Sequence, residues 1–220
     1  MIKTTLFATI KDAMQFTGAL STPSKMPCFG WSIPAQKCKT GSFLRNKKGS
    51  VCEKCYAMKG NYTFPNVKNA LQDRLDRFNA NPEMFVEAMV FILEKKKAEF
   101  FRWFDSGDLQ SVEMLQAFAE IAKRLPNVKF WLPTKEWSIV YKFLKVNTLP
   151  ENLNVRLSSY MIEDERADNS AAKYAKRLGV SMSSVKKEGY NCPASSQGNS
   201  CGNCRACWSS SVFNVTYKRH

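Results

Sequence analysis

The sequence contains a single histidine, His220, and this scarcity limits the chemistry that the chain can perform. Without a histidine inside the chain, we expect neither a Ser-His nor a Cys-His catalytic pair. The sequence also lacks the G-x-x-x-x-G-K-[ST] loop that cradles phosphates and the G-x-G-x-x-G fingerprint of dinucleotide-binding domains. Simple hydrolysis and hydride transfer are therefore not expected. His220 itself is expected in a free tail, with metal coordination as the alternative.

Long apolar runs are also missing. Lys3, Lys11 and Asp12 interrupt the apolar residues of the first 20 positions, unlike the continuous apolar core of a signal peptide. No window is long and apolar enough to predict a membrane span. We therefore expect a protein of the reducing cytoplasm, where clustered cysteines bind metal more often than they form disulfides. A secreted disulfide protein is the alternative.

Acidic residues are scarce near the N-terminus. The net charge of the chain is +14, and residues 1–60 carry ten Lys and Arg against two acidic residues, a local charge of +8. A basic surface of this size could attract nucleic acid or another polyanion. A host or virion protein is a further candidate partner, no membrane is expected as one, and a merely solubilising surface is the alternative.

The middle of the chain reads as alternating strands and helices. Pro65 and the Asn81-Pro82 pair indicate the starts of two helices between residues 65 and 97. Apolar runs predict strands near residues 100, 129, 153 and 180, and helices are expected over 137–146 and over 168–178 with Asp168 as N-cap. A spacing of about 25 to 30 residues is that of one strand-helix unit. The fold class is therefore α/β.

A complete eight-unit barrel takes about 250 residues, more than the 220 of this chain. We expect either a partial (β/α) barrel or a short open parallel sheet, with cysteine-rich loop segments at both ends of the chain. The expected organisation is a single domain in three parts. A basic, cysteine-containing loop region covers 1–64, the β/α repeats cover 65–185, and a cysteine-rich, cluster-binding tail covers 186–220.

The stretch CGNCRAC carries the strongest cofactor signal. It places Cys201, Cys204 and Cys207 at C-x2-C-x2-C spacing, with which ferredoxin loops direct three thiolates at one iron-sulfur cluster. A structural zinc site usually takes two separate C-x2-C knuckles, whereas these two pairs share Cys204. A four-iron, four-sulfide cluster is the prediction, and zinc or plain reduced thiols are the alternatives.

The other cysteines offer further ligands. Cys38, Cys52 and Cys55 precede the repeats, and Cys192 is the nearest fourth ligand for the C-terminal triplet. Two arrangements stay open: each half of the cysteines holds its own centre, or loops from opposite ends of the chain share one. The surroundings of Cys28 suit plain packing equally well.

Polar residues follow the predicted strands and are expected to gather at one rim, because the carboxyl ends of parallel strands form the functional face of β/α proteins. The carboxylates of Asp105 and Asp108 and the amine of Lys135 are the candidate catalytic groups. Ser106, Gly107 and Thr134 are candidate ligand-binding residues. The alternative is that both aspartates cap the next helix and Lys135 pairs with them.

Four stretches carry a family resemblance: VCEKCYAMKGNY, FRWFDSGDLQS, KFWLPTKEW and CPASSQGNSCGNCRACW. In this order, from about residue 25 onwards, they resemble the phage "gene product eighty-eight" domain family. The resemblance implies a virus-encoded protein in an infected bacterium, with virion association as a further implication. The cysteine-rich loop before β/α repeats is also similar to radical-SAM proteins. Their C-x3-C-x2-C triplet is incomplete here, since Lys48 occupies the first position and only Cys38 could replace it.

Two functions follow as hypotheses. The first is an iron-sulfur protein with a radical-SAM-like partial barrel, whose cluster serves electron transfer or a small-molecule reaction at the rim; S-adenosylmethionine is a candidate cofactor. The second is a non-enzymatic viral protein, stabilised by an iron-sulfur or zinc centre, that binds nucleic acid or a host or virion partner.

Overall fold

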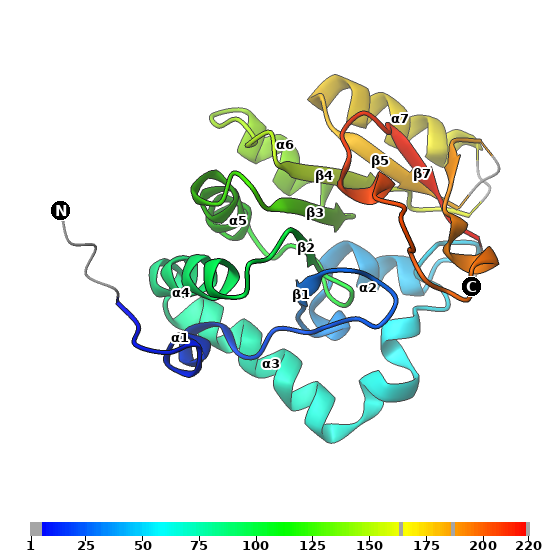
Figure 1. Cartoon of the computed structure of the whole chain (residues 1–220). Coiled ribbons are helices and arrows are strands. Elements are labelled where there is room, and N and C mark those ends of the chain that lie inside the picture. Colours follow the sequence, from blue (N-terminus) through cyan, green and yellow to red (C-terminus); the bar gives the residue numbers. More distant parts are fainter. Residues whose placement is uncertain (1–5, 163–164, 186–187, 219–220) are drawn as a thin grey trace.

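A computed structural model of the chain describes residues 6–162, 165–185 and 188–218, the side chains of 165–169 excepted (Figure 1). Its centre is a sheet of seven strands in the order β1-β2-β3-β4-β5-β7-β6. Every neighbouring pair runs parallel. The strands are β1 (Phe29–Trp31), β2 (Phe100–Trp103), β3 (Lys129–Thr134), β4 (Leu153–Ser158), β5 (Ser181–Ser184), β6 (Tyr190–Asn191) and β7 (Asn214–Thr216).

The α-helices and the short 3-10 turns lie between these strands in the chain. The helices are α1 (Ile10–Thr17), α2 (Lys39–Arg45), α3 (Pro65–Ala80), α4 (Pro82–Lys95), α5 (Val112–Arg124), α6 (Trp137–Leu144) and α7 (Glu165–Leu178). The 3-10 turns are η1 (Ala35–Lys37), η2 (Tyr56–Met58), η3 (Gly60–Thr63), η4 (Pro193–Ser196) and η5 (Ala206–Trp208).

The predicted α/β fold is confirmed, and its four predicted strands are β2 to β5. Asp105 and Thr134 lie at the carboxyl ends of the adjacent strands β2 and β3, as expected. The sheet is open, with β1 and β6 at its edges. Strand β1 enters the sheet from the region expected to be loop, and β7 lies between β5 and β6, out of chain order. The parallel sheet therefore extends beyond the repeats of residues 65–185 on both sides.

Most helix boundaries agree with the sequence signals. Pro65 is the first residue of α3, and the side chain of Asn81 caps α4 by accepting from the backbone N–H of Met84 at 3.0 Å. Asp168 is not an N-cap, because α7 begins at Glu165 and Asp168 lies inside it. The region 1–64 contains α1, α2 and β1, none of which we predicted. Short elements of this kind are stabilised by tertiary contacts more than by local pattern.

The two faces of the sheet are covered differently. On one face the ring of Trp103 stacks on Phe118 of α5 with centroids 3.6 Å apart, and Phe130 joins the same core. Figure 1 shows α4, α5 and α6 in a row beside these strands. Side chains of alternate residues point to the other face, where Trp131 and Phe100 pack against Trp208 of the C-terminal segment. The cysteine-rich segment therefore covers the face that lacks this helical layer.

Within the residues that the structure describes, no helix is long and apolar enough to cross a membrane.

Candidate cysteine centres and the rim of the sheet

All eight cysteines are free thiols, and seven of them fall into two groups. The rim group consists of Cys38, Cys52 and Cys55, whose thiolate charges would repel one another. Two of its sulfur atoms lie close to Gly41 in α2. A β-carbon at Gly41 would lie 3.7 Å from Sγ of Cys38 and 3.7 Å from Sγ of Cys52. The chain thus has its smallest residue at the point where these two thiols face the same space.

Backbone contacts fix the loops that carry the rim group. Cys38 directly precedes α2, and its own side chain does not cap that helix. The cap is supplied by Glu136, whose carboxylate accepts from the backbone N–H of Thr40 at 2.8 Å and from its hydroxyl at 2.9 Å. Cys52 and Cys55 belong to one turn, in which the N–H of Cys55 donates to the carbonyl of Cys52. Glu136 therefore positions Cys38 from the loop after β3.

Lys135 and Asp108 lie beside the rim group. The carboxylate of Asp108 accepts from the hydroxyl of Thr134 at 2.6 Å and from the backbone N–H of Lys135 at 2.9 Å. Burial raises the pKa of Asp108 from 3.8 to about 6, although the charge of Lys135 opposes the shift. Burial lowers the pKa of Lys135, but the charges of Cys52, Asp108 and Cys38 outweigh it and raise the pKa overall. The charge of half-buried Lys135 thus interacts with thiols and with a carboxylate.

Asp105 lies at the same rim in a separate polar contact. Its carboxylate accepts from the hydroxyls of Ser32 and Tyr62, and its carbonyl accepts from the hydroxyl of Tyr56. The preceding residue, Phe104, has a φ of 55°, which is uncommon outside glycine. Hydrogen bonds to Asp105, which follows β2, therefore connect it with Ser32 after β1 and with Tyr56 and Tyr62 after Cys55.

The three candidate ligand-binding residues make structural contacts. Ser106 is buried, and its hydroxyl donates to the carbonyl of Ile33 at 3.0 Å. Gly107 has a φ of 84° and lies against the same residue, so closely that a β-carbon would be 2.7 Å from the carbonyl oxygen of Ile33. Thr134 holds Asp108 and accepts from the N–H of Glu136. These contacts lock the loops after β1, β2 and β3 together.

Capping does not explain the two aspartates. The N-cap of α5 is Ser111, whose hydroxyl accepts from the N–H of Met114 at 3.2 Å. Asp105 and Asp108 precede this position; Asp105 accepts from Tyr62 of η3, and Asp108 accepts from Thr134 at the end of β3. Neither carboxylate therefore caps α5.

The tail group consists of Cys192, Cys201, Cys204 and Cys207. The thiolate charges of Cys192 and Cys204 would each act on Cys201, and that of Cys192 would act on Cys207. Two tyrosine hydroxyls flank the group: Tyr190 lies 3.4 Å from Sγ of Cys204, and Tyr217 lies 3.4 Å from Sγ of Cys207. Cys192 is thus close enough to Cys201 and Cys207 for their charges to interact.

A buried arginine from β4 shapes the tail loop. Arg156 is fully buried, and its guanidinium donates to carbonyl oxygens at 2.7 to 3.2 Å. The accepting residues are Met182, Ala206, Cys207, Ser209, Val212 and Phe213. Trp208 adds a bond from its indole N–H to the carbonyl of Phe101 at 2.9 Å. The loop that carries Cys207 is therefore fixed to β4 and to β2.

The environment of the thiols disfavours a nucleophilic role. Burial raises the pKa of Cys38 to about 12 and that of Cys207 to about 11. Nearby cations oppose this shift: Lys135 acts on Cys38, while Arg156 and Arg102 act on Cys207. A reactive cysteine needs a lowered pKa, whereas a bound metal supplies the positive charge that deprotonates a buried thiol.

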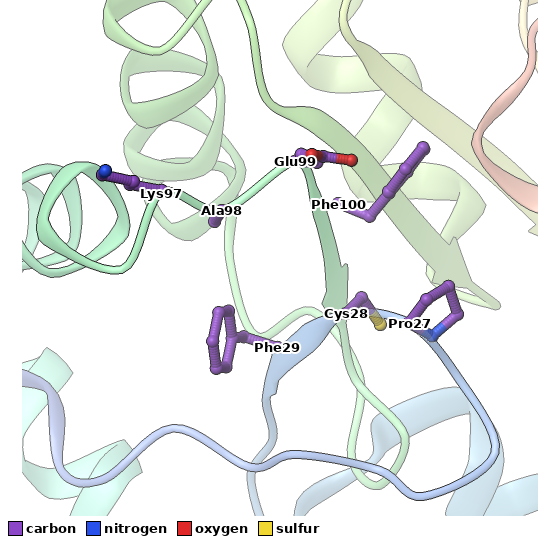
Figure 2. A pocket seen from close by; sticks show the side chains of 7 residues that line it. All are labelled: Pro27, Cys28, Phe29, Lys97, Ala98, Glu99 and Phe100. Atoms are coloured by element: carbon purple, nitrogen blue, oxygen red, sulfur yellow. The ribbon is translucent and has the colours of Figure 1, made fainter.

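Cys28 lies apart from the rim group that it precedes in the chain. Burial raises its pKa to about 12; the charge of Arg102 opposes this, and that of Cys201 adds to it. Its sulfur lines a hollow of about 320 Å³ at the amino ends of β1 and β2. Figure 2 shows Pro27, Cys28 and Phe29 on one side of this hollow and the stretch from Lys97 to Phe100 on the other. Cys28 therefore neighbours the tail group, and both packing and a role near Cys201 fit its position.

Among the described residues, no group of three or more His, Cys, Asp and Glu side chains is arranged as the ligands of one metal ion. The thiols of the rim group and of the tail group are free.

Arg156 and Glu136 were not among the predicted site residues. An arginine within the apolar run LNVRLS is a signal, because a charged residue in a buried strand needs several partners. Glu136 follows Lys135 directly, but the helix that it caps begins almost 100 residues earlier. No local pattern could have connected the two.

Comparison with known proteins identifies a family. The sequence model of the family described as Gene product 88 matches residues 5–210. No curated protein and no solved structure is significantly similar to the chain. Because the match spans most of the sequence, the chain belongs to this family of phage gene products.

Proposed function

We propose that this member of the Gene product 88 family is an iron-sulfur protein with two cysteine-ligated centres, one of which serves a reaction at the rim of the sheet. The observation that carries the proposal is the gathering of three thiols, a half-buried lysine and a buried carboxylate at the carboxyl ends of parallel strands. That edge is where β/α proteins carry out their chemistry.

The rim group is the candidate reactive centre. Three thiols from Cys38, Cys52 and Cys55 would leave one corner of a four-iron cluster without a protein ligand. Such a corner can bind a substrate or S-adenosylmethionine and supply one-electron chemistry. Because the sulfur atoms of Cys38 and Cys52 both lie near Gly41, Cys38 can complete the triplet that the sequence leaves unfinished, which supports the radical-SAM-like interpretation.

The chain's own residues would prepare this corner for a polar ligand. Lys135 offers a positive charge to a carboxylate or phosphate group of that ligand. Asp108, with its pKa raised to about 6, can exchange a proton near neutral pH. The hydrogen bond from Thr40 to Glu136 ties the segment that follows Cys38 to the loop that carries Lys135.

The tail group suits electron transfer or structural stabilisation. Cys192, Cys201, Cys204 and Cys207 would occupy all four corners of a cluster, which leaves no corner for a substrate. Trp208 and Trp131, with ring centroids 5.5 Å apart, cover the loop on the side of the sheet. As a phage gene product, the protein would act in the cytoplasm of the infected bacterium.

The test is anaerobic purification followed by iron, sulfide and zinc analysis. Two centres predict about eight iron and eight sulfide per chain. Replacing Cys38, Cys52 and Cys55 together by serine should remove about half of the iron, and so should the same change at Cys201, Cys204 and Cys207. Each variant should keep the spectroscopic signal of the other centre.

Added S-adenosylmethionine distinguishes the two centres. It should change the electron paramagnetic resonance signal only in proteins that retain the rim group. Colourless wild-type protein with zinc and no sulfide would overturn the proposal. Loss of all iron from both variants would instead indicate a single shared centre.

A further inference from the structure

The segment from Pro34 to Gln72 forms an exposed basic surface, called the basic flank below. In Figure 1 it runs from η1 through α2 and the cyan turns into α3. Its exposed lysines are Lys37, Lys39, Lys47, Lys48, Lys54, Lys59 and Lys68. The single acidic residue of the segment is Glu53, and its carboxylate accepts from the backbone N–H of Gly49 at 2.8 Å. Within the segment, positive charge therefore far outweighs negative charge.

Apolar side chains are exposed among these lysines. The basic flank contains four of the seven large hydrophobic residues that are exposed in the described part of the chain. Phe43 is 72% exposed and Phe64 is 53% exposed, and Met58 lies between them in the sequence. The ring of Tyr56 is also half exposed, although its hydroxyl donates to the carbonyl of Asp105. Exposed aromatic rings cost solvation free energy, so their grouping among cations indicates a partner with flat faces and negative charge.

A cavity of about 350 Å³ opens in the same surface, between η1, the η2-η3 turns and α3. Lys37 and Lys68 line it together with Tyr62, and side-chain amides complete its polar wall. These amides belong to Gln36, Asn69 and Gln72. Amides can both donate to and accept from the edge of a nucleobase, and lysines bind phosphate. The size and the lining suit one nucleotide.

We propose that the basic flank binds single-stranded nucleic acid, with one nucleotide in this cavity and neighbouring bases stacked on Phe43 and Phe64. A single strand fits better than a duplex, because unpaired bases expose the faces that stack on aromatic rings. An acidic peptide would satisfy the lysines but would leave the exposed rings and the amide wall without matching groups. Binding requires no metal centre, so this inference does not depend on the proposed reaction.

The cavity also adjoins the rim. Tyr62 lines the cavity with its ring, and its hydroxyl donates to the carboxylate of Asp105 at 3.2 Å. Ala57, another lining residue, is two positions from Cys55. A strand held on the basic flank would therefore pass close to the rim group.

The binding test uses fluorescence anisotropy of the full chain with a labelled 20-nucleotide single strand, DNA and RNA in separate experiments, and with the matching duplex. We expect binding at about 50 mM salt that weakens steeply towards about 200 mM. Replacing Lys37 and Lys68 by glutamine should lower the affinity about tenfold and reduce the log-log salt slope by about 1.4, the value for two lost phosphate contacts on a single strand. Replacing Phe43 and Phe64 by alanine should weaken the single strand more than the duplex and leave the salt slope unchanged.

The matched control replaces Lys123 and Lys142 by glutamine. These two lysines are exposed on α5 and α6, so the control removes the same amount of charge outside the basic flank. It should change the affinity less than twofold, and circular dichroism should show that all variants are folded. Absence of binding at about 50 mM salt would overturn the proposal. Equal losses in control and cavity variants, duplex binding as tight as single-strand binding, or equal binding of a labelled polyglutamate would overturn it as well.

Discussion

The Nε–H of Arg156, in the middle of β4, donates to the backbone carbonyl of Cys207 at 3.1 Å. The same guanidinium donates to the carbonyls of Ala206 and Ser209, which lie before and after Cys207 in the chain. A planar group with five N–H donors is suited to collecting several carbonyls, which a lysine could not do. The position of the last thiol in CGNCRAC is thus set by a residue some 50 positions earlier.

Replacing Arg156 by methionine should destabilise the protein by at least about 3 kcal/mol, because several buried carbonyls would lose their donor. Iron bound by the tail group should fall in the same variant. Urea unfolding and iron analysis would measure both effects. Arg124→Met is the control: its ion pair with Glu87 is exposed, and its loss should cost less than about 1 kcal/mol. A variant at Arg156 as stable as the wild type would contradict the role assigned to it.

The pKa of Asp108 predicts a dependence of stability on pH. In the folded protein this pKa is raised from 3.8 to about 6, so the folded state binds the proton more tightly than the unfolded state. The resulting stabilisation is present below about pH 4 and is lost as the pH rises through about 6. Relative to Asp108→Asn, the wild type should lose up to about 3 kcal/mol over this range. Urea unfolding of both proteins between pH 4 and 8 measures the difference, and a constant difference would refute it.

Gly107→Ala should strongly destabilise the rim. The new β-carbon would overlap the side chain of Ile33, and φ at this position is 84°. Gly179→Ala provides the control, because Gly179 also has a positive φ of 66° but a β-carbon there would have no other atom within 4 Å. We expect a loss of about 1 kcal/mol at Gly179 and of about 3 kcal/mol or more at Gly107. Similar losses in thermal unfolding would show that close packing at Ile33 is unimportant.

Gly41→Ala should separate metal binding from folding. Alanine favours helix over glycine by about 1 kcal/mol, so the metal-free protein should stay folded. The β-carbon would lie 3.0 Å from Cβ of Cys38 and 3.7 Å from the sulfur atoms of Cys38 and Cys52. Iron at the rim group should therefore fall while the tail group keeps its own. Full iron and sulfide content in this variant would show that no cluster lies beside Gly41.

Local sequence signals were sufficient to predict the β/α repeats. Pro65 and Asn81 mark helix starts through contacts within one turn, and the run FFRWF indicates a strand buried on both faces. Asp168 shows where such signals fail, since an acidic residue also occurs within helices. The short strand β1, only three residues long, has no periodicity to detect. Its pairing with β2 depends on residues about 70 positions away.

The candidate site was predicted in composition but not in arrangement. Strand ends indicated that Asp105, Asp108 and Lys135 would share a rim, because parallel topology brings carboxyl ends together. The partition of the thiols could not be derived, since it depends on how the loops after β1 fold back over the sheet. Spacing identified Cys52 and Cys55 as a pair, whereas only the fold brings Cys38 to them.

The position of β7 has a consequence for the order of events during synthesis. Strand β6 pairs with β7 and has no other neighbour in the sheet, while β7 also pairs with β5. Cys192 to Cys207 precede β7 in the chain, so the edge of the sheet cannot be completed before these thiols have been synthesised. A chain truncated before Asn214 would lack the strand that joins β6 to β5, and its tail thiols would belong to an incomplete sheet.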